Sequence, residues 1–337
     1  MQAATRHYLT AYLEPLAPFL ELPDVTDVFV NRPGEVWTEK SGGVVEKHAV
    51  AELTGEVLAR LARQIASFSA QGISREQPLL AGSLPDGARV QIAIPPATRG
   101  EIAIAIRKHV SPHLSLSAYI SDRPTSTAIV PSDDNANFVH LGCGNAAIEL
   151  LFAAVRQKRT ILVSGGTSTG KTTFLNALLR EVPQSERLVL IEDTPELAIT
   201  HANVVGLIAA RGAMGEARVE MEDLLVASLR LRPDRIIVGE IRGREAMTFL
   251  RAANSGHPGS MSSIHANSPR RAIDQLAHLV LQSGNQMAWD SIVSYIERSL
   301  DIIVQLERVA GERRIAGVIA RSDSVSLPAD ISNGLAL

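Results

Sequence analysis

A run of eight residues after an apolar segment constrains the fold of this chain more than any other feature. The run is Gly-Gly-Thr-Ser-Thr-Gly-Lys-Thr at 165–172, and it follows the strand-like segment at 161–163. A glycine-rich turn with this spacing, between a strand and a helix, lets backbone N–H groups surround phosphates at the positive end of the helix. The pattern therefore predicts an α/β domain with a phosphate-binding loop.

The residue types of this loop predict ATP as the ligand, with Mg²⁺ as its counterion. Lys171 is expected to reach the β and γ phosphates, and the Thr172 hydroxyl is expected to bind Mg²⁺. The residues predicted to bind nucleotide are Gly165, Gly166, Thr167, Ser168, Thr169, Gly170, Lys171, Thr172 and Thr173.

Two acidic strand ends are the candidates for hydrolytic chemistry. Glu240 closes the apolar run at 235–238, where it can orient or deprotonate the water that attacks the γ phosphate. The aspartate usual at such a strand end is absent, because Val238 or Gly239 holds its place. Glu192, after the run at 188–191, is therefore expected to supply the carboxylate for Mg²⁺, although an ordinary solvated strand end would also explain it.

Histidines and arginines complete the candidate site. His257 and His265 lie in one small-residue stretch at 254–267, which is interpreted as a third strand-to-helix edge next to the nucleotide. A histidine there could donate to the γ phosphate or to the glutamates, although ordinary loop histidines would also explain the pattern. Arg89 and Arg107, on two alternating N-terminal runs, are candidates to cover the γ phosphate. Further candidates are Arg230 and Arg232.

The rest of the chain predicts a two-domain organisation. Short β-rich runs and turns, with a helix at 53–68 and paired strands at 89–94 and 102–107, indicate a smaller α+β domain over 1–120. A proline- and aspartate-containing segment at 121–137 is interpreted as a linker. From 138 to 337, strands alternate with helices, including helices from 171, at 220–231 and from 244, which predicts a parallel sheet.

Composition narrows the class of protein. The single cysteine, Cys143, excludes an internal disulfide and a four-cysteine zinc module. No stretch approaches the roughly 20 apolar residues of a membrane span, and the first residues lack the apolar core of a signal peptide. A cytoplasmic location is therefore expected. The net charge of −3 and an aromatic content of 4% disfavour direct binding of nucleic acid.

The order of the motifs resembles the type II/type IV secretion ATPase superfamily, most closely the traffic ATPases of bacterial type IV secretion and conjugation. The resemblance rests on the phosphate loop, Ile-Glu-Asp-Thr-Pro-Glu, Leu-Arg-Pro-Asp-Arg-Ile-Ile-Val-Gly-Glu-Ile-Arg-Gly, and Ser-Gly-His-Pro-Gly-Ser with Ile-His-Ala-Asn downstream. These matches cover about residues 160–270, and Pro-Asp-Gly-Ala-Arg-Val with Pro95-Pro96 extends them weakly into the N-terminal half.

The resemblance implies a RecA-like motor domain, an N-terminal domain that covers the nucleotide, and a homohexamer at the cytoplasmic face of the inner membrane. Its implied partners are inner-membrane channel components and a coupling ATPase. It assigns Glu240 as the Walker-B glutamate, Glu192 to an acidic box, and His257 and His265 to a histidine box. It also matches Arg89 and Arg107 to arginines directed towards the phosphates.

Three alternatives stay open at this point. Pilus-retraction and tight-adherence motors of the same superfamily also lack the zinc module. A nucleic-acid motor on the same core would need a basic or aromatic strand-binding surface. A nucleotide switch without turnover would lack the two glutamates that favour hydrolysis.

Overall fold

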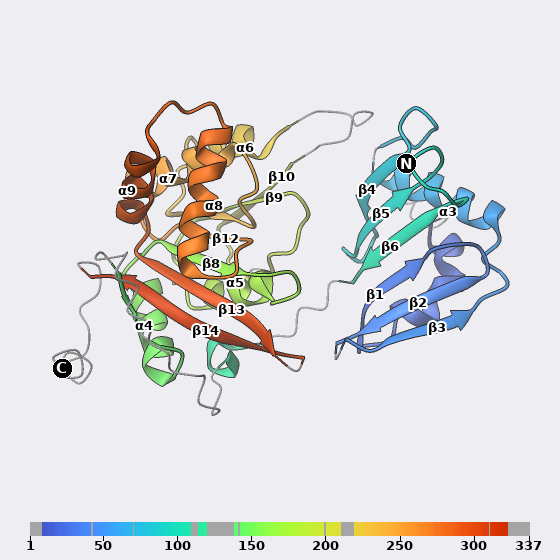
Figure 1. Cartoon of the computed structure of the whole chain (residues 1–337), viewed down its shortest axis with the longest axis horizontal. Helices are drawn as coiled ribbons and strands as arrows, with labels where there is room; N and C mark the ends of the chain where they lie inside the picture. Colours follow the sequence, from blue (N-terminus) through green and yellow to red (C-terminus); the bar gives the residue numbers. More distant parts are fainter. Residues whose placement is uncertain are drawn as a thin grey trace. The chain divides into compact units, whose positions relative to one another are not determined.

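The computed structural model describes residues 9–41, 43–69, 71–108, 114–119, 138–140, 142–198, 200–209, 219–309 and 311–322 (Figure 1). The chain forms two compact units. Unit 1 comprises Met1–Ser111, Thr194–Glu196 and Ala209–Glu220, and unit 2 comprises Pro112–Asp193, Leu197–Ile208 and Met221–Leu337. The predicted linker at 121–137 lies outside the described residues, so the boundaries at 120 and 138 stay predictions.

Unit 1 contains an antiparallel sheet in the order β3-β2-β1-β6-β5-β4. Its strands are β1 (Val25–Val30), β2 (Glu35–Lys40), β3 (Val45–Ala49), β4 (Leu79–Ser83), β5 (Arg89–Ala93) and β6 (Ala103–Arg107). The predicted pairing of the runs at 89–94 and 102–107 is confirmed, since β5 and β6 are antiparallel neighbours.

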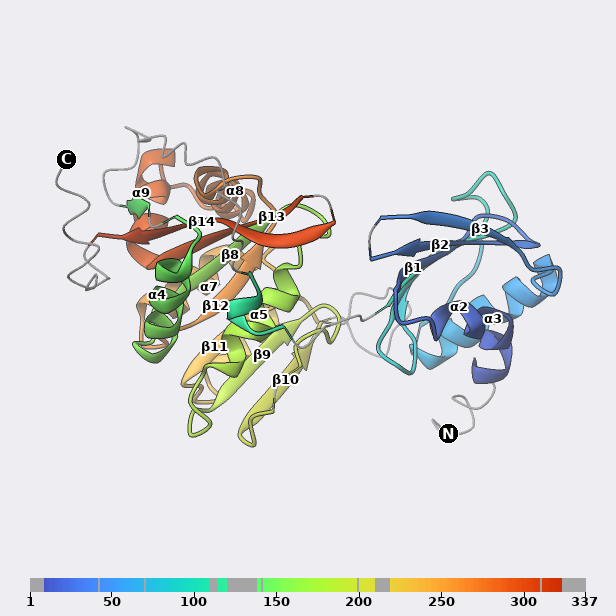
Figure 2. The ribbon, with the colours of Figure 1, turned by 90° about the horizontal axis from the view of Figure 1, so that it is seen from below.

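One face of this sheet is covered by helices (Figure 2). They are η1 (Glu14–Leu16), α2 (Ala17–Leu20) and α3 (Gly55–Phe68). The helix predicted at 53–68 begins at Gly55 because the Thr54 side chain accepts a hydrogen bond from Val57 N–H and caps it. Its apolar stripe, with Leu58, Leu61 and Ile65 fully buried, packs into the core of the unit.

Unit 2 contains an eight-stranded sheet in the order β10-β9-β11-β12-β8-β13-β14-β7. The strands are β7 (Phe138–His140), β8 (Ile161–Gly165), β9 (Leu188–Glu192), β10 (Val204–Ile208), β11 (Arg235–Val238), β12 (Met261–Ile264), β13 (Ile302–Val309) and β14 (Glu312–Arg321). The six strands β10, β9, β11, β12, β8 and β13, which are neighbours in this order, are all parallel, and this confirms the predicted parallel sheet. The strands β14 and β7 add an antiparallel edge.

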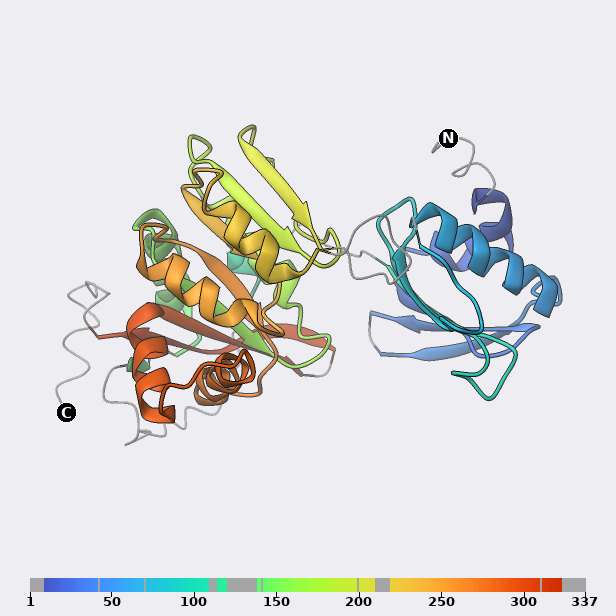
Figure 3. The same cartoon turned by 90° about the horizontal axis from the view of Figure 1, so that it is seen from above.

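Helices cover both faces of this sheet. They are η2 (Leu116–Tyr119), α4 (Asn145–Arg156), α5 (Lys171–Arg180), α6 (Met221–Ser228), α7 (Glu245–Asn254), α8 (Pro269–Gln282) and α9 (Trp289–Ser299). Figure 2 shows η2, α4 and α5 on one face, and Figure 3 shows α6 to α9 on the other. The helix predicted at 220–231 is shorter in the structure, Met221–Ser228, because the chain continues in turns in which Arg230 N–H bonds the Ala227 carbonyl and Leu231 N–H bonds the Ser228 carbonyl.

This topology gathers chemistry at one edge. The parallel strands β8, β9, β11 and β12 all end there, and each is followed by a segment singled out in the sequence. Ligands of such sheets bind beyond the carboxyl ends of the strands. We refer to this side as the carboxyl edge and to the opposite side as the amino edge.

Candidate functional site

The phosphate-binding loop turns tightly between β8 and α5. Ser168 and Gly170 adopt left-handed φ values of 61° and 86°. Thr169 Oγ1 donates a hydrogen bond of 2.9 Å to the Gly166 carbonyl. A Cβ on Gly165 would lie 2.4 Å from Thr169 Oγ1, so the loop closes this way only around a glycine. Hydrogen bonds and glycines within the loop therefore determine its conformation.

Lys171, the first residue of α5, folds back over this loop. Its Nζ donates to the carbonyls of Gly165 and Gly166, at 3.1 and 3.3 Å. The same Nζ lies 3.9 Å from Glu240 Oε1. A cation is thus held at the mouth of the loop, where β and γ phosphates are predicted to bind. Thr172 and Thr173 follow in the first turn of α5.

Glu240 belongs to a small charged network at the carboxyl edge. Arg242 Nη2 donates to Glu240 Oε2 at 2.5 Å, and Arg242 Nη1 donates to Asp193 Oδ2 at 2.8 Å. The planar guanidinium therefore joins the acidic groups that follow β11 and β9. Sequence reasoning placed Glu240 here but did not nominate Arg242 or Asp193, although both lie within the quoted motifs.

Glu192 is placed differently from Glu240. Its side chain is buried at the end of β9, and its Oε1 accepts a hydrogen bond of 2.8 Å from Leu197 N–H. A Cβ on Gly239 would lie 3.4 Å from Glu192 Cγ, which shows how closely the two strand ends pack. One carboxylate oxygen of Glu192 thus anchors the backbone at Leu197, in the segment that follows β9. The role of Glu192 as a Mg²⁺ ligand stays a prediction.

The structure separates the two histidines. Within the stretch 254–267, Met261–Ile264 form β12, which α8 follows, so the structure has the predicted third strand-to-helix connection. His265 follows β12 at the carboxyl edge, whereas His257 precedes it at the amino edge and its Nδ1 lies 3.1 Å from the Pro233 carbonyl. The role predicted for His257 at the phosphates stays a prediction, and the geometry of unit 2 gives it no support.

Arg89 and Arg107 are directly opposite each other in unit 1. They form a registered cross-strand pair between β5 and β6, and Arg107 is also opposite Asp27 of β1. Cβ atoms of such a pair are about 5 Å apart, and like charges at that spacing repel. Two carboxylates lie against this arginine pair, since Arg89 Nε is 2.7 Å from Glu196 Oε1 and Asp27 is the cross-strand neighbour of Arg107.

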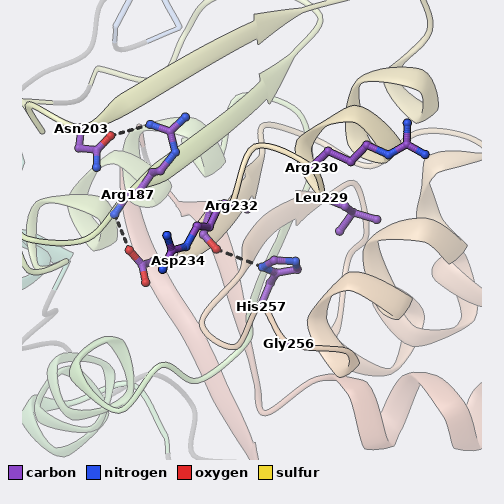
Figure 4. A pocket seen from close by; sticks show the side chains of 9 residues that line it. Arg187, Asn203, Leu229, Arg230, Arg232, Asp234, Gly256 and His257 are labelled. Atoms are coloured by element: carbon purple, nitrogen blue, oxygen red, sulfur yellow. Dashed lines mark hydrogen bonds between the residues drawn. The ribbon is translucent and has the colours of Figure 1, made fainter.

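Arg230 and Arg232 line an open pocket of about 590 Å³ at the amino edge of unit 2 (Figure 4). Two arginines that sequence reasoning weighed for phosphate contact thus lie on the opposite side of the sheet from the loop of the same subunit. The full lining is Arg187, Asn203, Leu229, Arg230, Arg232, Pro233, Asp234, Gly256 and His257.

Hydrogen bonds organise one wall of this pocket. Arg187 donates through Nη1 to Asn203 Oδ1 at 2.6 Å and through Nε to the Leu231 carbonyl at 2.8 Å. The Arg187 backbone N–H bonds Asp234, and this bond, with the charge of Lys158, holds the pKa of the Asp234 carboxyl below its usual range.

A further arginine lies beside the loop. Arg313 of β14 donates from Nη1 to Thr173 Oγ1 at 3.4 Å. Sequence reasoning missed it, because the C-terminal stretch was left without assigned elements. Among the described residues, no group of three or more His, Cys, Asp or Glu side chains is arranged to hold a metal by itself.

A parallel sheet flanked by helices, with a lysine-bearing phosphate loop beside a strand-end glutamate, defines the P-loop class of nucleotide-binding proteins. The chain belongs to the type II/IV secretion system protein family, whose pattern it matches over residues 11–322. The resemblance stated from the sequence is thereby confirmed. In the described part of the chain, no helix has both the length and the apolar character that crossing a bilayer requires.

Named relatives support the same assignment. The chain is 35% identical over 324 residues to type IV secretion system protein VirB11 of Bartonella quintana, covering 91% of both chains. It is 38% identical over 307 residues to VirB11 of Brucella suis, covering 88% of this chain and 84% of the relative.

A solved structure supports the predicted fold class. The ADP-bound pilus retraction motor PilT is 20% identical, with a TM-score of 0.60 over 93% of this chain and 83% of that chain. The predicted RecA-like motor fold with a preceding smaller domain is confirmed at the level of the fold.

Proposed function

We propose that this chain is an ATPase motor that couples ATP hydrolysis to export or pilus assembly in a bacterial type IV secretion system. The observation that carries the proposal is the placement of Lys171 between the loop carbonyls and Glu240. A cation for the β and γ phosphates and a carboxylate for the attacking water then lie at one edge of one sheet. The two VirB11 relatives are type IV secretion system proteins, which supports a type IV secretion system as the place where this chain works.

The residues present fit a nucleotide with Mg²⁺. The Thr172 hydroxyl lies in the first turn of α5, and Arg242 holds the carboxylates of Asp193 and Glu240 at the same edge of the sheet. Hydroxyl, carboxylate and phosphate oxygens are the hard ligands that Mg²⁺ prefers. When bound, Mg²⁺ would neutralise charge on the β and γ oxygens. We propose Thr172 as its protein ligand and Glu192 as a further carboxylate supporting it.

Glu240 is the proposed base or water-orienting group. One of its oxygens faces Lys171 and the other accepts a hydrogen bond from Arg242, so both contacts constrain the orientation of the carboxylate. We propose that His265, at the end of the adjacent β12, donates to the γ phosphate or to this glutamate.

Arg89 and Arg107 of unit 1 are the arginines proposed to cover the γ phosphate. On binding a phosphate, Arg89 would exchange its ion pair with Glu196 for a charge-assisted bond to a phosphate oxygen, and Arg107, opposite it on β6, would add a second positive charge. We propose that they contact the phosphates of a nucleotide held by a unit 2, whether of the same or of a neighbouring subunit. Hydrolysis would then change the contacts between the units and supply the mechanical step.

The proposed working state is a homohexamer at the cytoplasmic face of the inner membrane, docked on channel components and a coupling ATPase. Heterologous contacts between identical subunits close into rings when their rotation allows. Light scattering with and without ATP tests the assembly, and a strict monomer under both conditions would contradict it.

The decisive experiment for the activity is the variant Lys171→Ala. It removes the cation that faces the phosphates, so phosphate release from ATP should fall to background. Lys47→Ala, which removes a lysine paired with Glu35 in unit 1, is the matched control and should keep wild-type turnover. Hydrolysis at the wild-type rate in Lys171→Ala would exclude the proposed site.

A further inference from the structure

The hairpin of β13 and β14 brings a second cation to the phosphate loop. Arg313 stands one residue after the start of β14, opposite Arg308 of β13. Its aliphatic part lies against the last glycine of the loop: a Cβ on Gly170 would be 2.6 Å from Arg313 Cδ and 3.2 Å from its Nε. The hairpin is drawn in red in Figure 2.

The guanidinium continues from this contact onto the first turn of α5. Arg313 Nη1 donates to Thr173 Oγ1 at 3.4 Å, and both side chains are partly or fully buried. Two separate constraints therefore disfavour any residue other than glycine at position 170: its left-handed φ of 86° and the Arg313 side chain that packs against it. The side chain is laid along the loop rather than extended into solvent.

The first turn of α5 is where phosphate groups meet unsatisfied backbone N–H groups. Lys171 is directed to the β and γ phosphates, since its Nζ lies between the loop carbonyls and Glu240. Thr173 lies two residues further along the helix, so the cation beside it is placed for the phosphate nearer the nucleoside.

We propose that Arg313 is a nucleotide-binding residue, which contacts the α phosphate of the bound nucleotide through its guanidinium. The proposal rests on the proposed function, because it assumes that the loop binds a nucleotide. On binding, Nη1 exchanges the long bond to Thr173 for a charge-assisted bond to a phosphate oxygen. The contact is made equally in the ATP and ADP states, so it contributes to affinity rather than to the chemical step.

Its neighbour in sequence offers a matched control. Arg314 points to the opposite face of the hairpin and pairs with Glu307 through a bond of 2.6 Å from Nε to Oε1. Replacing either arginine by alanine removes one positive charge from the same strand. Only Arg313→Ala removes it from the loop.

The test measures ADP and GDP binding to the full chain by calorimetry. Arg313→Ala should weaken both nucleotides by about tenfold, and Arg313→Lys by less, because an ammonium keeps the charge but loses the planar fork. Arg314→Ala should match the wild type. Steady-state kinetics of Arg313→Ala should show KM for ATP raised by about tenfold with kcat changed less than about twofold.

The other outcomes are decisive as well. Unchanged ADP affinity in Arg313→Ala overturns the inference, and a loss confined to ADP overturns it too, since a phosphate contact does not depend on the base. Should Arg313→Ala fail to fold, judged by its thermal unfolding, Arg313→Gln replaces it with the same expected loss. Failure of the wild type to bind ADP would instead remove the proposed function itself.

Discussion

Arg242 bonds the carboxylate of Glu240 from two residues away, with Nη2 2.5 Å from Oε2, and through its other terminal nitrogen it holds Asp193. The guanidinium thus ties the ends of two neighbouring strands, β11 and β9. An acid–base carboxylate works only within hydrogen-bond reach of the water that it orients. If Glu240 is the base or water-orienting group, as proposed, Arg242 is predicted to act on the reaction through it, as a positioning residue.

The first prediction concerns this arginine. Arg242→Ala should lower kcat for ATP hydrolysis by about tenfold with little change in KM, because Glu240 stays present but loses its fixed orientation. Arg242→Lys should recover part of the loss, since one ammonium cannot fork to both carboxylates. Steady-state kinetics check this. Arg244→Ala, an exposed arginine on the same segment, serves as the control and should behave as wild type. A wild-type kcat in Arg242→Ala would refute the positioning role.

The second prediction concerns Glu240 itself. Glu240→Gln should bind a fluorescent ATP analogue with near wild-type affinity, because the amide keeps the size and can still accept from Arg242. Its turnover should fall by about 10²-fold or more, since an amide cannot take a proton. Glu192→Gln is measured beside it. Normal hydrolysis in Glu240→Gln together with its loss in Glu192→Gln would mean that the two roles are reversed.

Sequence patterns predicted those parts of the fold whose signals are local. The helix at Gly55–Phe68, the strands β5 and β6, and the loop between β8 and α5 each combine a clear hydrophobic period with a cap or turn residue. The position of Glu240 and Lys171 at the carboxyl edge could be predicted, because neighbouring parallel strands end at the same edge of a sheet. Those residues lie in one sheet whose order is set by crossover connections.

The remaining features depend on contacts between distant segments. The four residues Met261–Ile264 carry too short a pattern for the position of this strand to be predicted, and the strand decides that His257 and His265 are at opposite edges. Arg313 is 140 residues from Thr173 in sequence, so only the pairing of β13 with β8 and β14 reveals it. Arg242 lies within a recognised motif, but its hydrogen bond to Asp193 could not be predicted without knowing that β9 and β11 are neighbours in the sheet.

The third prediction concerns the arginines of unit 1. The double variant Arg89→Ala/Arg107→Ala should lose about 10³-fold in turnover if the pair supplies the cationic cover of the γ phosphate. Each single variant shows which of the two carries the effect. Arg99→Ala, which removes an exposed arginine from the loop between β5 and β6, is the control. Turnover that is unchanged in the double variant would leave these residues as part of the unit 1 surface only.

The last prediction concerns the stability of unit 2. Arg235 is fully buried at the start of β11, and it donates to both oxygens of Glu186, from Nε at 2.6 Å and from Nη2 at 3.0 Å. Burial alone would raise the pKa of Glu186. The hydrogen bonds and charge of Arg235, with a smaller effect of Lys158, outweigh it and place the pKa below its ordinary value of 4.5.

The sign of the pH dependence follows from this direction. A carboxyl group whose pKa is lower in the folded state contributes its full stability above the unfolded pKa and loses it as the pH falls through the folded pKa. Glu186→Gln should therefore lower the free energy of unfolding by about 3 kcal/mol at neutral pH, since it leaves a buried guanidinium without its counterion. It should also reduce the loss of stability below roughly pH 4.5. Urea unfolding at several pH values measures both effects, with Glu149→Gln, an exposed glutamate on α4, as the control. Equal unfolding free energies for Glu186→Gln and the wild type at neutral pH would show that the buried pair is energetically neutral.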